Sequence, residues 1–419
     1  MHCLLVALSK EVMNSKRAAN TALLGLTSSE LISHLGNQIA AVTIPILVLQ
    51  QTHSPLAAGI ASAANALPMV FAALFYGLFD KHLSAFTISV VSDVLSAVSS
   101  LLLPLAFLYF APLATSLLFL LILLGALFDP LGAAARQSLL PSLARLAEQP
   151  LTRINALRGG FENGADFLGP ALAVALIHGL GASAAFFVNA ASFAACALLF
   201  ALTVPRRKKR HLAIVSPNFL QSVTFLIKNP PLRTLMLIGV LASFVLSAFL
   251  GLLLPVLAVQ ELKAPAILGF ALSAFGLSAA IGAFAFAWLS QLLSRNVIFY
   301  GGLFASALGI ALCAGAQNAI SVTAACALAG LLLGAGNPLQ QSLLQEQVPA
   351  ELLGQVYAAL GAIRLGAGPL GLVCAGLATQ QLGVRPALWL GSFTLAVVAI
   401  LGRLLMPFAA HKASSQRRL

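Results

Sequence analysis

The sequence is poor in charged residues. Only 8% of its 419 residues are charged and 11 are acidic, whereas 60% are hydrophobic. A water-soluble domain carries roughly 25% charged residues, so this chain lacks the polar side chains needed to cover a surface that faces water. Lipid must therefore be its main solvent, which excludes an ordinary water-soluble fold.

Motifs that hold metals, nucleotides or reactive groups are also missing. The five cysteines form no C-x-x-C pair, so neither a zinc site nor a disulfide framework is indicated. There is no Walker loop, no nucleophile elbow and no metal-ligand cluster. We therefore expect no enzyme activity, no cofactor and no ATP binding, so that any transport uses a gradient, with protons the suspected ion, or runs downhill.

What the chain does contain is a series of apolar runs of about 20 residues or more, the length that crosses a bilayer as a helix. They predict an all-α membrane protein with twelve transmembrane helices. A membrane β-barrel would instead show strands of about ten residues with alternating polarity. The predicted spans are 28–50, 55–78, 84–110, 114–136, 160–179, 182–204, 234–258, 266–290, 297–316, 319–343, 355–379 and 384–408.

The chain repeats itself at half its length. Residues 45–67 align with residues 255–277 at a shift of 210 positions, with Pro45 on Pro255 and Gly59 on Gly269. Two similar apolar halves predict two pseudo-symmetric six-helix bundles with a transport pathway. The predicted organisation is a cytoplasmic segment 1–27, a bundle 28–204, a cytoplasmic linker 205–233, a second bundle 234–408 and a cytoplasmic tail 409–419.

The chain has a net charge of +12, and its basic residues are distributed unevenly between the two sides of the predicted membrane topology. With the N-terminus in the cytoplasm, nearly all lysines and arginines fall in inner loops or at inner helix ends, and only Lys263 and Arg385 fall outside. This pattern predicts cytoplasmic termini and contact with anionic lipids, and it argues against nucleic-acid binding. Residues 206–210, RRKKR, belong to the inner surface.

The linker and the N-terminal segment each have a distinctive local sequence. Phe219, Val223 and Leu226 fall on one helical face, which predicts a short amphipathic helix in the linker. Residues 1–12 make a poor signal peptide, so we expect either a disordered extension or a start assigned upstream of Met13.

Ionisable side chains inside the predicted spans are few, and each is a candidate functional residue because its burial in lipid is costly. In the first span, Glu30, His34 and Asn37 share one face. Either Glu30 reaches the inner headgroups, or these residues face a substrate cavity and Glu30 or His34 carries a proton.

The fifth span carries a second polar stripe, in which Arg158, Glu162 and Asp166 follow one another at steps of four. Two carboxylates on one stripe could share protons and couple transport to them. Alternatively, the stripe is structural and Arg158 neutralises Glu162.

Three further charges lie inside predicted spans. Asp93 is a candidate for the substrate cavity, whereas Asp129-Pro130 mirrors Asn337-Pro338, which favours a structural turn at Asp129. Arg364 either extends to the cytoplasmic surface or faces the cavity, where it would attract an anion or a carboxylate.

Several segments have a familiar form: residues 35–68 and 128–143, Asn155-Ala156-Leu157, Gly169-Pro170, Asn229-Pro230-x-Leu232-Arg233, Asn337-Pro338, residues 348–356 and Gly368-Pro369-Leu370-Gly371. On these residues the chain resembles the major facilitator superfamily, and within it the drug-antiporter-like branch that includes macrolide efflux proteins and enterobactin exporters. The resemblance covers nearly the whole chain from about residue 24.

The chain also departs from the family pattern. Asn37 stands where aspartate is frequent, and only Leu78 and Asp80 of the loop signature after the second span are kept, with Lys81 in place of arginine. The resemblance implies that Asp80 and Lys81 latch the inner gate. It also makes Gly169 and Pro170 gating residues, although the glycine pattern of this helix is reduced.

The resemblance implies a secondary transporter of the bacterial inner membrane that exports an amphipathic drug, macrolide or siderophore in exchange for protons. We expect a monomer. The alternatives are an importer, a uniporter or a lipid or lysolipid transporter of the same fold, and, as a different class, a non-transporting receptor or scaffold.

Overall fold

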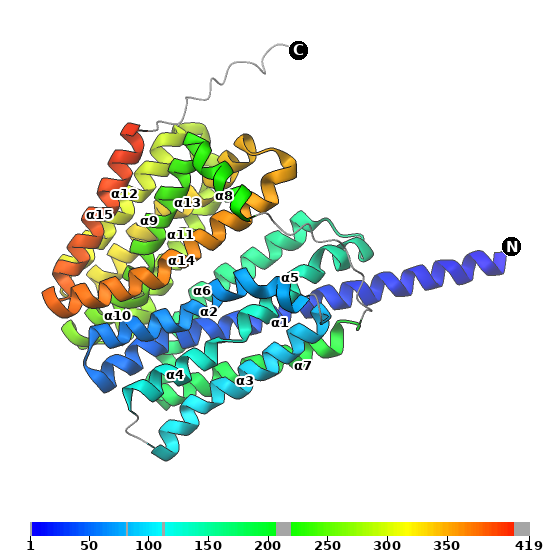
Figure 1. Cartoon of the computed structure of the whole chain (residues 1–419), viewed down its shortest axis with the longest axis horizontal. Coiled ribbons are helices and arrows are strands. Elements are labelled where there is room, and N and C mark those ends of the chain that lie inside the picture. Colours follow the sequence, from blue (N-terminus) through cyan, green and yellow to red (C-terminus); the bar gives the residue numbers. More distant parts are fainter. Residues whose placement is uncertain (1, 81–82, 111–113, 207–218, 406–419) are drawn as a thin grey trace, which may run out of the picture. The chain divides into compact units, whose positions relative to one another are not determined.

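The computed structural model describes residues 2–80, 83–110, 114–206 and 219–405, and every element in these ranges is a helix (Figure 1). The chain divides into two compact units, Met1–Ser216 and Pro217–Leu419. In each unit the helices lie side by side.

The described residues of unit 1 form seven helices. They are α1 (His2–Thr52), α2 (Pro55–Asp80), α3 (Ala85–Phe110), α4 (Thr115–Ala126), α5 (Asp129–Leu146), α6 (Leu151–Leu180) and α7 (Ala182–Thr203). Helix α1 is central, because it packs against α2, α5, α6 and α7.

Unit 2 begins with the short helix α8 (Phe219–Lys228), as the linker sequence predicted. The following elements are α9 (Pro230–Ala248), the π-helical turn η1 (Phe249–Leu253), α10 (Leu254–Val256), a second π-helical turn η2 (Leu257–Glu261), α11 (Ala266–Leu292), α12 (Arg295–Gly315), α13 (Ala319–Gln347), α14 (Ala350–Leu382) and α15 (Val384–Leu405).

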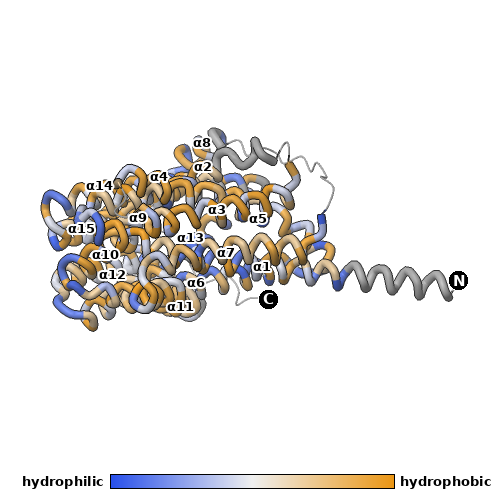
Figure 2. Tube along the Cα trace, turned by 90° about the horizontal axis from the view of Figure 1, so that it is seen from below, coloured by the Kyte–Doolittle hydropathy of each residue, from blue (hydrophilic) through white to orange (hydrophobic). Residues whose placement is uncertain are grey.

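Eleven segments in the described part of the chain are long and apolar enough to cross a membrane, and apolar residues cover most of the helical tube in Figure 2. Helices α4 and α5 together form one of them, Thr115–Leu146, and the elements from α9 to η2 form another, Pro230–Glu261. Helix α6 is not among the eleven because it carries several polar residues. With 30 residues, or about 45 Å, it is nevertheless long enough to cross.

Several helices extend beyond the predicted spans. Helix α1 includes residues 2–12, which were expected to be disordered or misassigned, and residues 13–27, and α6 begins at Leu151 rather than at 160. The fourth span continues to Leu146 with a break at residues 127–128. Hydropathy marks only the apolar part of a helix, whereas the backbone ladder continues through polar residues that have local partners.

The repeat is visible in the backbone. His53 and Lys263, which are 210 positions apart, both have positive φ values, 52° and 49°, in the turns before α2 and α11. Gly181 and Gly383 have φ values of 85° and 89° in the turns before α7 and α15. Non-glycine residues rarely adopt this region, so His53 and Lys263 share an uncommon backbone conformation at corresponding positions of the repeat.

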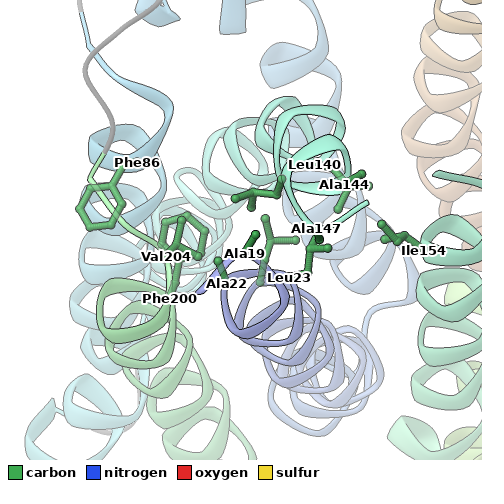
Figure 3. Close-up of a cluster of buried hydrophobic side chains, with 12 residues drawn as sticks. Ala19, Ala22, Leu23, Phe86, Leu140, Ala144, Ala147, Ile154, Phe200 and Val204 are labelled. Atoms are coloured by element: carbon green, nitrogen blue, oxygen red, sulfur yellow. The ribbon is translucent and has the colours of Figure 1, made fainter. Parts of the chain in front are cut away.

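One end of unit 1 is held together by a cluster of buried apolar side chains from α1, α3, α5, α6 and the end of α7 (Figure 3). Leu23 of α1 and Leu140 of α5 lie in this cluster, and Phe86 and Phe200 pack with ring centroids 5.6 Å apart. The Arg206 guanidinium lies 5.3 Å from the centroid of the Phe86 ring, a cation–π distance. The cluster therefore fixes the ends of α3, α5, α6 and α7 relative to α1.

Helices α11 and α13 of unit 2 approach so closely that their contact requires glycine. A Cβ atom at Gly334 would lie 1.9 Å from the carbonyl oxygen of Ala279, and one at Gly330 would lie 2.3 Å from that of Phe275. Small residues allow membrane helices to pack backbone against backbone. This contact places α13 where its polar end meets α14.

We predict that Gly334→Ala separates α11 from α13 and lowers the stability of the protein by about 1–3 kcal/mol, because overpacking forces backbone shifts. The control is Gly336→Ala in the same helix, where an added Cβ meets nothing within 4 Å. Thermal unfolding of the detergent-purified variants checks this prediction. Equal melting temperatures for the two variants would contradict the close approach.

Candidate functional site

The polar residues of α1 meet partners on α5 and α6 and form a continuous polar seam inside unit 1. We define the seam by Glu30, Ser33, His34, Asn37 and Gln38 of α1 with the groups that they contact. These side chains share one face of α1 because they are spaced by three and four residues. The seam brings together the two stripes that the sequence analysis had treated separately.

The first contact of the seam joins Glu30 to Arg158 of α6. The Arg158 Nε and Nη2 atoms donate to the two carboxylate oxygens at 2.7 and 3.1 Å, and both side chains are 16% exposed. Glu162 lies 3.9 Å from the same guanidinium. Arg158 thus neutralises mainly Glu30.

One helical turn further along the seam, His34 meets Asp166. The His34 Nε2 atom lies 2.9 Å from Asp166 Oδ1, and the amide of Gln38 contacts the same oxygen. Both ionisable side chains remain accessible, with 36% of His34 and 46% of Asp166 exposed. Both an imidazole and a carboxylate can bind a proton, so this pair is a candidate proton-binding group.

The third part of the seam reaches Asp129, at the start of α5. Asn37 Nδ2 donates to Asp129 Oδ2 at 2.7 Å, and the Ser33 hydroxyl donates to Oδ1 at 3.0 Å. The chain does break before Asp129, as the sequence indicated. However, the carboxylate also ties α5 to α1, a role that the interpretation as a structural turn missed.

Arg136 of α5 and Asp93 of α3 form a fully buried ion pair close to Asp129. The Arg136 Nη1 atom donates to both Asp93 oxygens at 2.8 and 2.6 Å, and their side chains are 1% and 0% exposed. Arg136 Nη2 lies 3.7 Å from Asp129. One guanidinium therefore serves two carboxylates, and Asp93 lies in this cluster rather than on an accessible surface.

Arg136 was missed at the sequence level because it stands at the end of the predicted fourth span, where a basic residue is expected to mark the inner surface. A signal was nevertheless present. Asp129 and Arg136 are seven residues apart, which places them on one face two turns apart. The helix continues past Arg136 to Leu146, so the residue lies inside the bundle.

In unit 2 the predicted site residue Arg364 lies on α14 and is half-buried. Its Nη1 atom donates to Gln340 Oε1 of α13 at 2.9 Å. Its side chain packs against Gly239 of α9.

The predicted gating residues fall into two groups. Gly169 lies at the α1–α6 contact, because a Cβ atom there would lie 2.4 Å from the Cβ of Gln38, and Pro170 follows inside α6. The side chain of Asp80 and all of Lys81 lie outside the described residues, so the latch remains a prediction. Within the described ranges, no group of three His, Cys, Asp or Glu side chains could hold a metal ion.

Comparisons with known proteins give the family context. The family described as Major Facilitator Superfamily matches residues 26–372. The multidrug efflux pump Tap of Mycolicibacterium fortuitum is 29% identical over 400 residues, which cover 92% of this chain and 96% of that protein. The pump of the same name from Mycobacterium tuberculosis is 28% identical over 363 residues, which cover 85% and 86%.

Solved structures share the architecture at low identity. The nucleoside transporter NupG superposes with a TM-score of 0.69 at 15% identity and covers 92% of this chain and 99% of its own. A POT family transporter in complex with a thioalcohol-conjugated peptide gives a TM-score of 0.72 at 11% identity, covering 91% and 95%. At these identities the likeness concerns the fold alone.

We predict that Arg136→Gln destabilises the protein by about 3–5 kcal/mol, because it leaves the Asp93 carboxylate buried without a counter-charge. The double variant Asp93→Asn with Arg136→Gln should recover a large part of this loss, because both charges are then removed. Melting temperatures of the purified variants measure the effect. Arg145→Gln, which removes an exposed charge from the same helix, is the control and should change little.

If the double variant were no more stable than Arg136→Gln alone, the two residues would not act as a pair, and the assignment of this cluster would be wrong.

Proposed function

Because the chain belongs to the major facilitator superfamily and is thus a secondary transporter rather than an enzyme, we propose that it exports an amphipathic small molecule by alternating access, driven by proton entry. The observation that carries the proposal is the polar seam of unit 1, in which a histidine and a carboxylate pair within otherwise apolar helices.

The seam supports proton coupling because some of its ionisable side chains are exposed, whereas the ion pair beside it is buried. Asp93 and Arg136 are closed off, whereas Glu162 and Asp166 of α6 have 56% and 46% of their side chains exposed. A coupling group must exchange protons with one side of the membrane and then with the other, so it must be reachable. We therefore assign the coupling proton to Asp166 with His34, with Glu162 as the neighbouring carboxylate.

The arrangement also provides a way to link protonation to movement. When Asp166 is ionised it attracts His34 and accepts from Gln38, and these contacts hold α6 against α1. A proton on Asp166 removes the negative charge that His34 pairs with, so the α1–α6 contact weakens. Gly169, which allows this close approach one turn later in α6, lies where such a movement would occur.

The substrate class is inferred from two sources. The spans are rich in apolar residues and carry few charges, which suits an amphipathic molecule better than a sugar. The curated relatives are named as multidrug efflux pumps, and both cover most of the chain. We therefore propose an amphipathic, drug-like substrate; neither relative's name supports a siderophore.

The membrane orientation belongs to the same proposal. This multi-pass membrane protein is assigned to the bacterial inner membrane with both termini in the cytoplasm, because its lysines and arginines concentrate in the loops on that side. Export then moves substrate away from the side that carries the basic loops. We propose that a single chain suffices, since each half supplies its own bundle.

We predict that Glu162→Gln combined with Asp166→Asn lowers export driven by a pH gradient to the background level while leaving substrate exchange without a gradient intact. Coupling requires a group that binds protons, whereas exchange requires only the binding site and the conformational change. The measurement is efflux of the apolar dye phenylnaphthylamine from proteoliposomes with an imposed pH gradient.

The matched control is Glu148→Gln. Glu148 is a carboxylate of unit 1 that lies outside the seam, just after α5, and pairs with Lys16 of α1. This variant should retain full gradient-driven export. Unchanged export by the seam variant would remove the coupling assignment, and dye uptake in the opposite direction would favour the importer among the alternatives.

A further inference from the structure

Arg364 is a cation of unit 2 that lies within a candidate membrane span and has no acidic partner among the side chains that the structure describes in this unit. It is nine residues after Gln355, or about 14 Å along the helix axis, in the segment Gln355–Leu382, which is long and apolar enough to cross a membrane. Among the side chains that the structure describes, its guanidinium has one recorded hydrogen bond, to the neutral amide of Gln340.

The acidic side chains described in unit 2 are engaged elsewhere. Glu346 accepts two hydrogen bonds from Arg295 at 2.7 and 2.8 Å, and Glu261 lies 3.6 Å from Arg385. Arg364 therefore differs from the arginines of unit 1, where Arg136 and Arg158 each face a carboxylate within 2.7 Å.

The position of the Arg364 side chain is set by its surroundings. Its stem fills the space beside Gly239, where an added Cβ would lie 3.2 Å from the Arg364 Cδ atom. The hydroxyl of Ser243 donates to the Arg364 carbonyl oxygen at 2.9 Å and fixes the backbone against α9. The side chain is thus held inside the bundle, although an arginine in lipid could lower its energy by extending toward the headgroups.

A guanidinium held in the apolar layer without a counter-charge is costly, and the cost is removed when an anion binds to it. Gln340 accepts from one nitrogen, and the other donors of the planar group have no hydrogen bond to a side chain that the structure describes. Such a fork matches the geometry of a carboxylate, sulfonate or phosphate.

We propose that Arg364 is the anion-recognition residue of the transporter and that its ligand is an apolar molecule with one anionic group. This inference rests on the proposed export function, since it defines the substrate class of the same protein. The same chemistry is present in an anionic lipid headgroup, and the experiment separates the two sources.

The test compares two dyes that share their rings and differ by one charge: anilinonaphthalene sulfonate and the neutral phenylnaphthylamine. Their affinities are measured by fluorescence on protein in phosphatidylcholine nanodiscs, with protein-free nanodiscs subtracted. The variants are Arg364→Gln and Arg364→Lys. The matched control is Arg403→Gln, which removes an exposed positive charge from the same unit.

We expect the native protein to prefer the sulfonate and Arg364→Gln to lose at least about tenfold of its affinity for the sulfonate, as for other charge-assisted hydrogen bonds. Arg364→Lys should lose several-fold, because lysine lacks the planar fork. Arg403→Gln should behave as the native protein. Affinity for phenylnaphthylamine should be the same in all four proteins, which also reports that each variant is folded.

An equal sulfonate affinity in the native protein and Arg364→Gln would overturn the proposal, as would the absence of any preference in the native protein. If Arg364→Gln does not fold, Arg364→Lys decides in the same way. Binding is measured without a gradient, so a loss of dye export in proteoliposomes would count against the proposed function and not against the anion site.

A final arm adds phosphatidylglycerol to the nanodiscs. Competition with the sulfonate in the native protein, but not in Arg364→Gln, identifies the lipid headgroup as the occupant. Sulfonate binding that does not change with this lipid identifies a dissolved, transported anion.

Discussion

The structure depends on one constraint: a charge that lies in the apolar layer needs a partner at the same depth. Arg136 satisfies this constraint with Asp93, at a Nη1–Oδ2 distance of 2.6 Å and with almost no exposed surface. A second carboxylate, Asp129, lies 3.7 Å away and extends the pair to α1 through Asn37. The ion pair therefore links α3, α5 and α1, and the accessible part of the seam is built on this fixed frame.

The two halves share backbone features but carry different charged residues within their spans. Their turns agree down to the positive φ values of His53 and Lys263. The charges in the turn before the Gly-Pro pair differ: Asp166 of α6 lies three residues before Gly169, and Arg364 of α14 lies four residues before Gly368. The related halves therefore share turn geometry, whereas this part of α6 carries an acidic residue and this part of α14 a basic one.

The sequence predicted a substantial part of the site. Glu30, His34 and Asn37 were placed on one face, and so were Arg158, Glu162 and Asp166, because helical spacing determines which residues share a face. The pairing between the stripes could not be predicted. That His34 meets Asp166, and that Arg158 binds Glu30 more closely than Glu162, depends on how α1 and α6 are rotated and shifted against each other.

Sequence alone determined that this is a multi-span helical membrane protein built from two related halves, because hydropathy and internal repetition are properties of the chain itself. It also indicated which residues carry charge within the spans. Only the tertiary structure decided which charges meet, that Asp129 and Arg136 belong to the buried cluster, and that Arg364 has no acidic partner among the described residues of its unit. The physical reason is that ion pairs require side chains from distant segments to approach within about 4 Å, and that approach is set by helix packing rather than by local sequence.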